Sequence, residues 1–160
     1  MRFEEDTNRK MSDEQESLLT GAHLALSVRQ PWAELVISGR KSIEVREWWT
    51  EYRGPLWIHA GLTQDVEMEH TFGLERLYRG GFIGRVSLTT IVRFDSDRWT
   101  RWRERHLSDG VMPQTAYGWI FKDPLRLNEP FPARGLPGLF QPSLEVTLAL
   151  QALLPSERED

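Results

Sequence analysis

The fold is decided by the stretch LALSVRQPWAELVISGRKSIEVREWWTEYRGPLWIHA, which runs from residue 24 to residue 60. Apolar residues alternate with others at its start, the period-two pattern of a half-buried strand; they are Leu24, Leu26 and Val28. A short helix should begin at Pro31, because proline fixes a helical φ and the first helical residue needs no backbone donor. Gly39 predicts the end of that helix, since glycine adopts the left-handed conformation that closes helices.

Two further strands are expected in the same stretch. Ile43 and Val45 alternate with polar residues over residues 41–46, so this segment should be a second half-buried strand. Residues 55–60, PLWIHA, have the composition of a third strand. Polar side chains therefore lie at the edges of a small apolar unit, an arrangement that favours a binding or catalytic site there.

Length and composition predict one soluble domain. The chain has 160 residues, 39% hydrophobic and 28% charged, which is typical of a globular protein with a substantial core. No apolar run approaches the roughly 18 residues of a membrane span, and the N-terminus lacks the layout of a secretory signal. The absence of cysteine excludes disulfides and thiolate zinc ligands. We therefore expect a cytoplasmic protein with no membrane partner.

The acidic residues are concentrated at the two ends of the chain. The formal net charge is −4, but acids exceed bases by three in residues 1–20 and by two in residues 156–160. Residues 21–155 therefore carry a formal net charge of about +1. The negative net charge of the whole chain thus does not argue against nucleic-acid binding. We expect residues 1–20 to be a disordered acidic lead, residues 21–155 to be the domain, and residues 156–160 to fray.

The rest of the chain predicts more strands and helices around this unit. Apolar residues mix with charged ones from Thr63 to Arg79, which favours a helix, and the run Phe82–Val92 should be a central strand. Gly84 within it marks a bulge or a close approach of another backbone. A short helix capped by Ser96 or Asp97 should follow.

The C-terminal third should consist of short extended segments joined by turns. Tyr117–Phe121 is a strand candidate, and five prolines should break the chain after it: Pro124, Pro130, Pro132, Pro137 and Pro142. Leu144–Leu150 fits a last strand that closes the sheet, and its apolar residues also fit a helix. In total the pattern indicates an α+β fold: a strongly bent, barrel-like mixed sheet of five to seven short strands with two or three helices.

The helix after Asp97 has two interpretations. Trp99, Trp102 and His106 lie at helical spacing, which indicates a face packed on the core with solvated arginines beside it. The alternative is a basic helix next to a nucleic-acid groove, since its neighbouring side carries Arg98, Arg101 and Arg105.

Three runs of the sequence resemble the ASCH (activating signal cointegrator homology) family, a branch of the PUA-like superfamily. They are Gln30–Ala33, Gly39–Arg46 and Arg53–Ala60. Gly84, the Tyr117–Trp119 strand and the Gly135–Gly138 turn look like later landmarks, so the resemblance covers roughly residues 24–148. It implies a β-barrel with flanking helices and a cleft beside the first helix and the Gly-x-Lys-x-x-Glu-x-Arg strand. The superfamily commonly handles RNA, and ASCH domains have been proposed to bind nucleic acid in this cleft.

The resemblance also implies a possible hydrolase. Some small bacterial members resemble amidohydrolases that act on N4-acetylcytidine with a lysine, a threonine and a glutamate, and others are described as ribonucleases. Lys41 matches the lysine, but Glu44 occupies the position of the threonine. Ser42 offers a hydroxyl at a shifted position. Lys41 and Glu44 are accordingly our catalytic candidates, and Lys41 would need a pKa lowered by burial or a neighbouring cation.

The candidate binding residues surround the same strand. They are Arg29, Gln30, Trp32, Lys41, Ser42, Glu44, Arg46, Trp48, Arg53 and His59. Arg46 would act as a forked donor and Glu44 as an acceptor from a base amino group, although the two also fit a surface ion pair. Strict alternation places Lys41 on the opposite face from Glu44, so their convergence requires a bend just after Gly39.

The aromatic and histidine candidates have alternatives of their own. Trp32 fits an apolar face and so a core role, whereas Trp48 is adjacent to Trp49 in a loop, so one of these two can offer a stacking surface for a base. Gln30 and Arg29 precede a helix N-terminus, which suits either an anion or structural capping. His59 lies in a strand and is either a hydrogen-bonded structural residue or part of the site.

We consider three hypotheses for the function. The first is an ASCH domain that binds RNA, another single-stranded nucleic acid (DNA included) or a modified nucleoside. The second is a metal-independent hydrolase of N-acylated cytidine or RNA, centred on Lys41. The third is a protein-interaction module that uses a Trp-rich surface. The histidines lack metal-ligand spacing and no phosphate-cradling glycine loop or dinucleotide fingerprint is present, so we expect neither a metal nor a cofactor.

Overall fold

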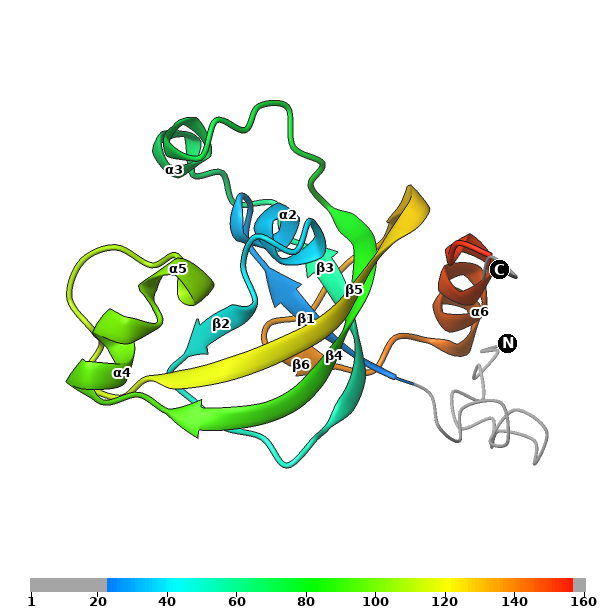
Figure 1. Cartoon of the computed structure of the whole chain (residues 1–160). Helices are drawn as coiled ribbons and strands as arrows, with labels where there is room; N and C mark the ends of the chain where they lie inside the picture. The colour runs from blue at the N-terminus through cyan, green and yellow to red at the C-terminus, as the bar shows by residue number, and fades with distance from the viewer. Residues whose placement is uncertain (1–22, 157–160) are drawn as a thin grey trace, which may run out of the picture.

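The structure is a computed structural model that describes residues 23–156 (Figure 1). The predicted acidic lead, residues 1–20, and the predicted tail beyond residue 156 lie outside the described residues. No helix in the described part of the chain is long and apolar enough to cross a membrane.

A curled half-barrel of six strands forms the centre of the molecule. The strands are β1 (Leu24–Val28), β2 (Ile43–Arg46), β3 (Gly54–Ala60), β4 (Gly81–Arg93), β5 (Tyr117–Pro132) and β6 (Leu139–Phe140). Their order across the sheet is β2-β5-β4-β3-β1-β6, with β1 and β3 parallel and the other neighbours antiparallel. The predicted α+β fold with a bent mixed sheet is therefore confirmed.

Short helices flank this sheet. Within residues 23–156 there are five, where the sequence predicted two or three: α2 (Trp32–Ile37), α3 (Val66–Thr71), α4 (Ser96–Arg101), α5 (Arg103–His106) and α6 (Leu144–Leu153). Figure 1 shows α4 and α5 together at one end of the long strands β4 and β5, and α6 on the other side of the molecule. The helix expected after Pro31 is α2, and Gly39 has the predicted left-handed φ of +83°.

The main core lies between α2 and the sheet. Buried side chains of α2 pack against those of β1, β3, β4 and β5; they include Ala33, Val36, Ile37, Leu26, Ile58, Val86 and Phe121. A second cluster joins α6 to the sheet and contains Trp57, which is fully buried. A third cluster joins Ile43 of β2 to Phe94 and Trp99, so the α4–α5 segment is packed on the sheet.

Gly84 is the close approach that the sequence predicted. The pairing of β4 with β5 shifts register between Phe82 and Gly84. A Cβ placed on Gly84 would lie 2.4 Å from the Leu125 carbonyl oxygen and 2.6 Å from Ile37 Cδ1. Glycine therefore lets α2 and β5 both approach β4 more closely than any side chain would allow.

Two of the helix predictions need correction. The helix predicted over Thr63–Arg79 is confined to Val66–Thr71, because Gly73 and Arg76 adopt positive φ values of 68° and 53° that no helix can continue through. The cap predicted at Ser96 or Asp97 is provided by Asp95, whose side chain accepts a hydrogen bond from the Arg98 amide.

The prolines and the last predicted strand also need correction. Pro124, Pro130 and Pro132 do not break the chain but lie within β5. Only residues 117–120 of β5 pair with β2, so beyond them β5 has a free edge where proline costs no ladder hydrogen bond. The segment from Leu144 is the helix α6, capped by Ser143, so of its two alternatives the helix is confirmed, and the sheet ends instead at β6.

Candidate functional site

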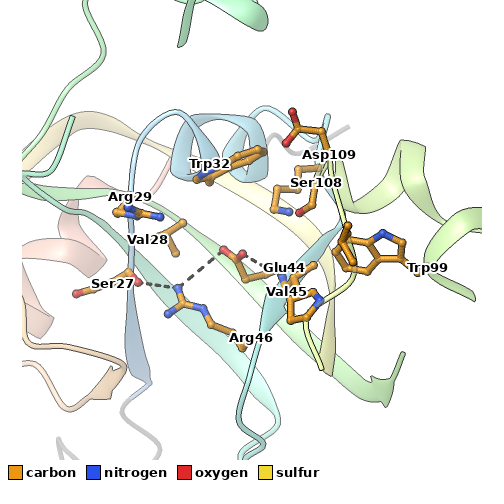
Figure 2. A pocket seen from close by; sticks show the side chains of 13 residues that line it. Ser27, Val28, Arg29, Trp32, Glu44, Val45, Arg46, Trp99, Ser108 and Asp109 are labelled. Atoms are coloured by element: carbon orange, nitrogen blue, oxygen red, sulfur yellow. Dashed lines mark hydrogen bonds and ion pairs between the residues drawn. The ribbon is translucent and has the colours of Figure 1, made fainter. Parts of the chain in front are cut away.

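A cavity of about 390 Å³ lies where the half-barrel stays open, between β1 and β2 (Figure 2). It is lined by residues of β1, α2, β2 and α4 and of the loops after β1, α2 and α5: Ser27, Val28, Arg29, Trp32, Lys41, Glu44, Val45, Arg46, Trp99, Ser108, Asp109, Val111 and Pro113. Five of the ten predicted binding residues line it, namely Arg29, Trp32, Lys41, Glu44 and Arg46.

The turn between α2 and β2 brings Lys41 and Glu44 to the same cavity. The Lys41 amide donates to the Leu35 carbonyl at 2.9 Å, and the Ser42 amide donates to the Arg105 carbonyl at 3.0 Å. The β2 ladder begins only at Ile43, so Lys41 precedes the strand and does not follow its alternation. The required bend after Gly39 is therefore present.

Lys41 places a buried cation beside the cavity. Its side chain is only 2% exposed, and its Nζ donates to the His106 carbonyl and lies 5.2 Å from the Trp32 ring centroid. Burial lowers the pKa of Lys41; Glu44 opposes this shift and Arg46 adds to it. The ammonium is thus held by one carbonyl and one aromatic ring, with a carboxylate close enough to influence its charge.

Glu44 and Arg46 form the floor of the cavity. The Glu44 Oε1 accepts from the Val45 amide at 3.0 Å, whereas Oε2 is buried and has no hydrogen-bond partner among the described residues. Arg46 Nη2 lies 3.9 Å from that oxygen, too far for a hydrogen bond, and donates to the Ser27 carbonyl at 2.8 Å. Figure 2 shows the Glu44 carboxylate directed across the cavity toward this guanidinium. This second oxygen is therefore a buried acceptor without a donor among the described residues, on a residue that lines the cavity.

The opposite wall comes from a segment that sequence reasoning did not assign to the site. Trp99, Ser108 and Asp109 line the cavity from α4 and the loop after α5. His106 holds this wall together: its Nε2 is 2.8 Å from the Trp99 carbonyl, its Nδ1 accepts from the Ser108 amide at 3.0 Å, and its ring stacks on Trp99. Two sequence signals concerned this segment: the helical spacing of Trp99 and His106 predicted their burial, and the arginines beside them allowed the alternative of a basic helix next to a nucleic-acid groove.

His106 should make this wall sensitive to acid. Burial lowers the pKa of His106 below its ordinary 6.5, and the nearby Lys41 and Arg103 charges act in the same direction. As the pH falls through 6.5 the unfolded chain therefore takes up a proton that the folded chain does not, so stability falls. Denaturant unfolding from pH 7 to pH 5 should show a steeper loss in the wild type than in His106→Gln, whose amide keeps a donor and an acceptor but does not titrate. Parallel curves for the two proteins would contradict this assignment.

The other five predicted binding residues lie outside this cavity, and two of them have structural contacts. Gln30 is buried; its Nε2 donates to the Tyr78 carbonyl and its Oε1 accepts from the Glu34 amide, both at 2.9 Å. His59 is buried on β3 with its Nε2 2.7 Å from the Ala133 carbonyl. These contacts hold the connections before α2 and after β5.

The remaining three are Ser42, Trp48 and Arg53. Ser42 lines a separate cavity of about 110 Å³ on the other side of the turn. The Trp48 ring packs edge-on against Trp119, with 4.8 Å between centroids. Arg53 is exposed; its Nη1 donates to the Thr50 and Tyr52 carbonyls and its guanidinium lies over the Trp49 ring. The tryptophans that line the cavity are therefore Trp32 and Trp99.

The charges of the cavity suit an anion or the polar edge of a ligand. Three cations and two carboxylates line it, with Lys41 and Glu44 the most buried of these. Within residues 23–156, His, Asp and Glu side chains form no group of three that could hold a metal ion.

Comparison with known proteins identifies several relatives of this chain. Residues 26–131 match the family model described as ASCH domain. Activating signal cointegrator 1 of Homo sapiens is 30% identical over 128 residues, and that of Mus musculus is 29% identical. The alignment covers 72% of this chain but 22% of each relative, so the chain spans about a fifth of their length.

Solved structures have a similar fold. ASCH from Zymomonas mobilis superposes with a TM-score of 0.62 at 18% identity, covering 84% of this chain and 96% of that one. A serine-to-alanine mutant of the same protein gives a TM-score of 0.61 at 20% identity, covering 83% of this chain and 96% of that one. At such identities the likeness concerns the fold alone.

Proposed function

The chain belongs to the ASCH domain family, and from this premise we propose that it binds single-stranded nucleic acid, RNA foremost, by holding one nucleotide in the cavity between β1 and β2. The observation that carries the proposal is the buried Oε2 of Glu44, which lacks a hydrogen bond and lies between two cationic side chains. A carboxylate oxygen left in this state costs free energy, and a ligand that donates a hydrogen bond to it removes that cost.

A nucleotide matches the chemistry of this cavity in two respects. An amino or imino group on the edge of a base donates to Glu44, while Arg46 offers donors to a neighbouring base oxygen or nitrogen. The phosphate of the same nucleotide is attracted by Lys41 and Arg29. A single strand fits better than a duplex, because bases in a duplex are stacked and their pairing edges are already occupied.

The size and lining of the cavity are consistent with one base. Its volume of about 390 Å³ falls in the usual range of about 300–1,000 Å³ for ligand pockets. The half-buried Trp32 supplies aromatic surface, and a base stacked on an aromatic ring gains about 1–3 kcal/mol.

The test is equilibrium binding of fluorescently labelled single-stranded RNA and DNA at two salt concentrations. Arg46→Ala should weaken binding about tenfold, because the variant cannot make the charge-assisted hydrogen bond to the base. Arg53→Ala is the matched control: it removes the same charge from the same strand–loop region but outside the cavity. Equal affinities for Arg46→Ala and Arg53→Ala would overturn the placement of the nucleotide, and no binding of RNA or DNA by the wild type would overturn the function.

We propose metal-independent hydrolysis of an N-acylated cytidine or of RNA as a second candidate. The observation in its favour is the lowered pKa of Lys41 beside the free oxygen of Glu44. A deprotonated amine is a base or nucleophile, and a carboxylate can orient the attacking water. Turnover in the presence of EDTA that Glu44→Gln abolishes would support this candidate, and the absence of turnover by the pure protein would refute it.

A further inference from the structure

Five arginines are concentrated on the segment that joins β4 to the cavity wall. We call Arg93, Arg98, Arg101, Arg103 and Arg105 the arginine face. All except the half-buried Arg98 are exposed, and they lie within 13 residues at one end of the half-barrel (Figure 1). Only three acids, Asp95, Asp97 and Glu104, lie within the same segment.

Two of these guanidinium groups are held in place by one aromatic ring. The Cζ atoms of Arg98 and Arg105 lie 4.9 and 4.8 Å from the Trp102 ring centroid. Trp102 is itself half-buried and packs against Phe94 in the third cluster. Two like charges over one indole raise the local positive potential, and their positions are fixed before any ligand arrives, which lowers the entropy cost of binding an anion.

Among the described residues, only one of the three acids in this segment forms an ion pair with an arginine of this face. Asp95 accepts from the Arg98 amide as the cap of α4, and Asp97 pairs with Arg101 at 2.8 Å. Arg93 and Arg105 make no side-chain hydrogen bond or ion pair with the other described residues. These two are therefore the arginines most available to an external anion.

The arginine face is directly connected to the cavity. The Arg105 carbonyl accepts from the Ser42 amide, and the next carbonyl, that of His106, accepts from Lys41 Nζ. Trp99, on the same segment as Trp102, lines the cavity. The segment that carries the five arginines therefore also forms part of the cavity wall.

We propose that the arginine face binds the phosphates of the strand that continues beyond the nucleotide held in the cavity. This proposal rests on the proposed function and extends the binding site. The cavity binds one nucleotide, and the arginine face binds the adjoining sugar–phosphate backbone. Phosphate contacts of this kind add affinity without sequence preference and make binding depend on salt and on strand length.

The experiment compares a mononucleotide with an oligonucleotide of about 12 nucleotides, a length within the range of single-strand binding sites. The variant is the double substitution Arg93→Gln and Arg105→Gln. For the long strand it should lower the slope of log affinity against log salt by about 0.7 for each phosphate that is no longer neutralised. Binding of the mononucleotide should be unchanged, because the cavity is intact.

Two controls make the outcome specific. Arg101→Gln alters the same face, but Asp97 already pairs with that arginine, so its effect on the slope should be smaller. Arg134→Gln removes an exposed arginine beside a different cavity, after β5, and should have no effect.

Three outcomes would contradict the proposal. If the double variant and Arg134→Gln bind the long strand with the same slope of log affinity against log salt, the arginine face does not hold the backbone. If the wild type binds the mononucleotide and the long strand equally, this proposal fails while the proposed function stands. If it binds neither, both fail.

Discussion

Replacing Lys41 with methionine should weaken nucleic-acid binding about 100-fold while leaving the protein folded, because truncating one partner of a buried charged contact typically costs about 2–5 kcal/mol. Lys41 is 2% exposed, so its charge acts on a ligand through little water. Methionine retains most of the length and volume of the side chain and fills irregular space well, so the packing around it should survive. Fluorescence anisotropy with single-stranded RNA measures the loss.

The same substitution should change how stability depends on pH. Because the folded pKa of Lys41 lies below its ordinary value of 10.5, the unfolded chain binds more protons than the folded chain at alkaline pH. Stability attributable to Lys41 therefore rises as the pH increases toward 10.5 and is lowest where the buried amine is charged. Methionine removes this dependence.

Denaturant unfolding of both proteins across this pH range tests the sign. The wild type should gain stability relative to Lys41→Met as the pH rises from neutrality. Lys122→Met serves as the control, because Lys122 is an exposed residue of β5. A wild type that instead loses stability relative to Lys41→Met would show that the buried amine is stabilised in its charged form.

Replacing Gly84 with alanine should destabilise the fold by about 3 kcal/mol, at the upper end of the cost of overpacking. The new methyl group would lie 2.4 Å from the Leu125 carbonyl oxygen, an atom of the backbone that cannot rotate away. It would also meet Ile37 of α2 at 2.6 Å. Relief requires β4 to separate from β5 or α2 to lift from the sheet, and both movements loosen the main core.

Thermal and denaturant unfolding measure this effect, and about 3 kcal/mol corresponds to a fall in Tm of about 6–12 °C for a domain of this size. Gly61→Ala is the matched control: its Cβ would meet no atom nearer than 3.9 Å, that of the Val28 carbonyl oxygen. Similar losses for both variants would contradict a steric cost specific to Gly84, because the Gly61 substitution creates no close contact and alanine by itself reduces the entropy of the unfolded chain.

The elements that the sequence predicted well are those with strong local signals. The alternation in residues 24–28 and 43–46 and the glycine at position 39 are properties of a few neighbouring residues, and the corresponding elements were found. The helix over Thr63–Arg79 failed because its apolar residues do not report the positive φ values at Gly73 and Arg76. The prolines of β5 were misread because the free edge on which they lie is set by the short length of β2, a tertiary fact.

The candidate site was predicted in part for the same reason. Its floor lies on one continuous stretch, and the resemblance to the ASCH family was carried by that stretch. The opposite wall was missed because Ser108 and Asp109 reach the cavity through long-range contacts, above all the one between Lys41 and the His106 carbonyl. Gln30 was assigned to the site because its position suits an anion, but its amide satisfies the backbone of Glu34 and Tyr78 instead.

The opening between β1 and β2 has a mechanical consequence. The sheet ends at β2 on one side and at β6 on the other, and Arg46 spans the opening from β2 to the Ser27 carbonyl of β1. A side-chain hydrogen bond thus joins β2 to β1, where a closed barrel would have a ladder of backbone hydrogen bonds. A ligand that engaged this guanidinium would therefore act on a hydrogen bond that joins β2 to β1 across the opening.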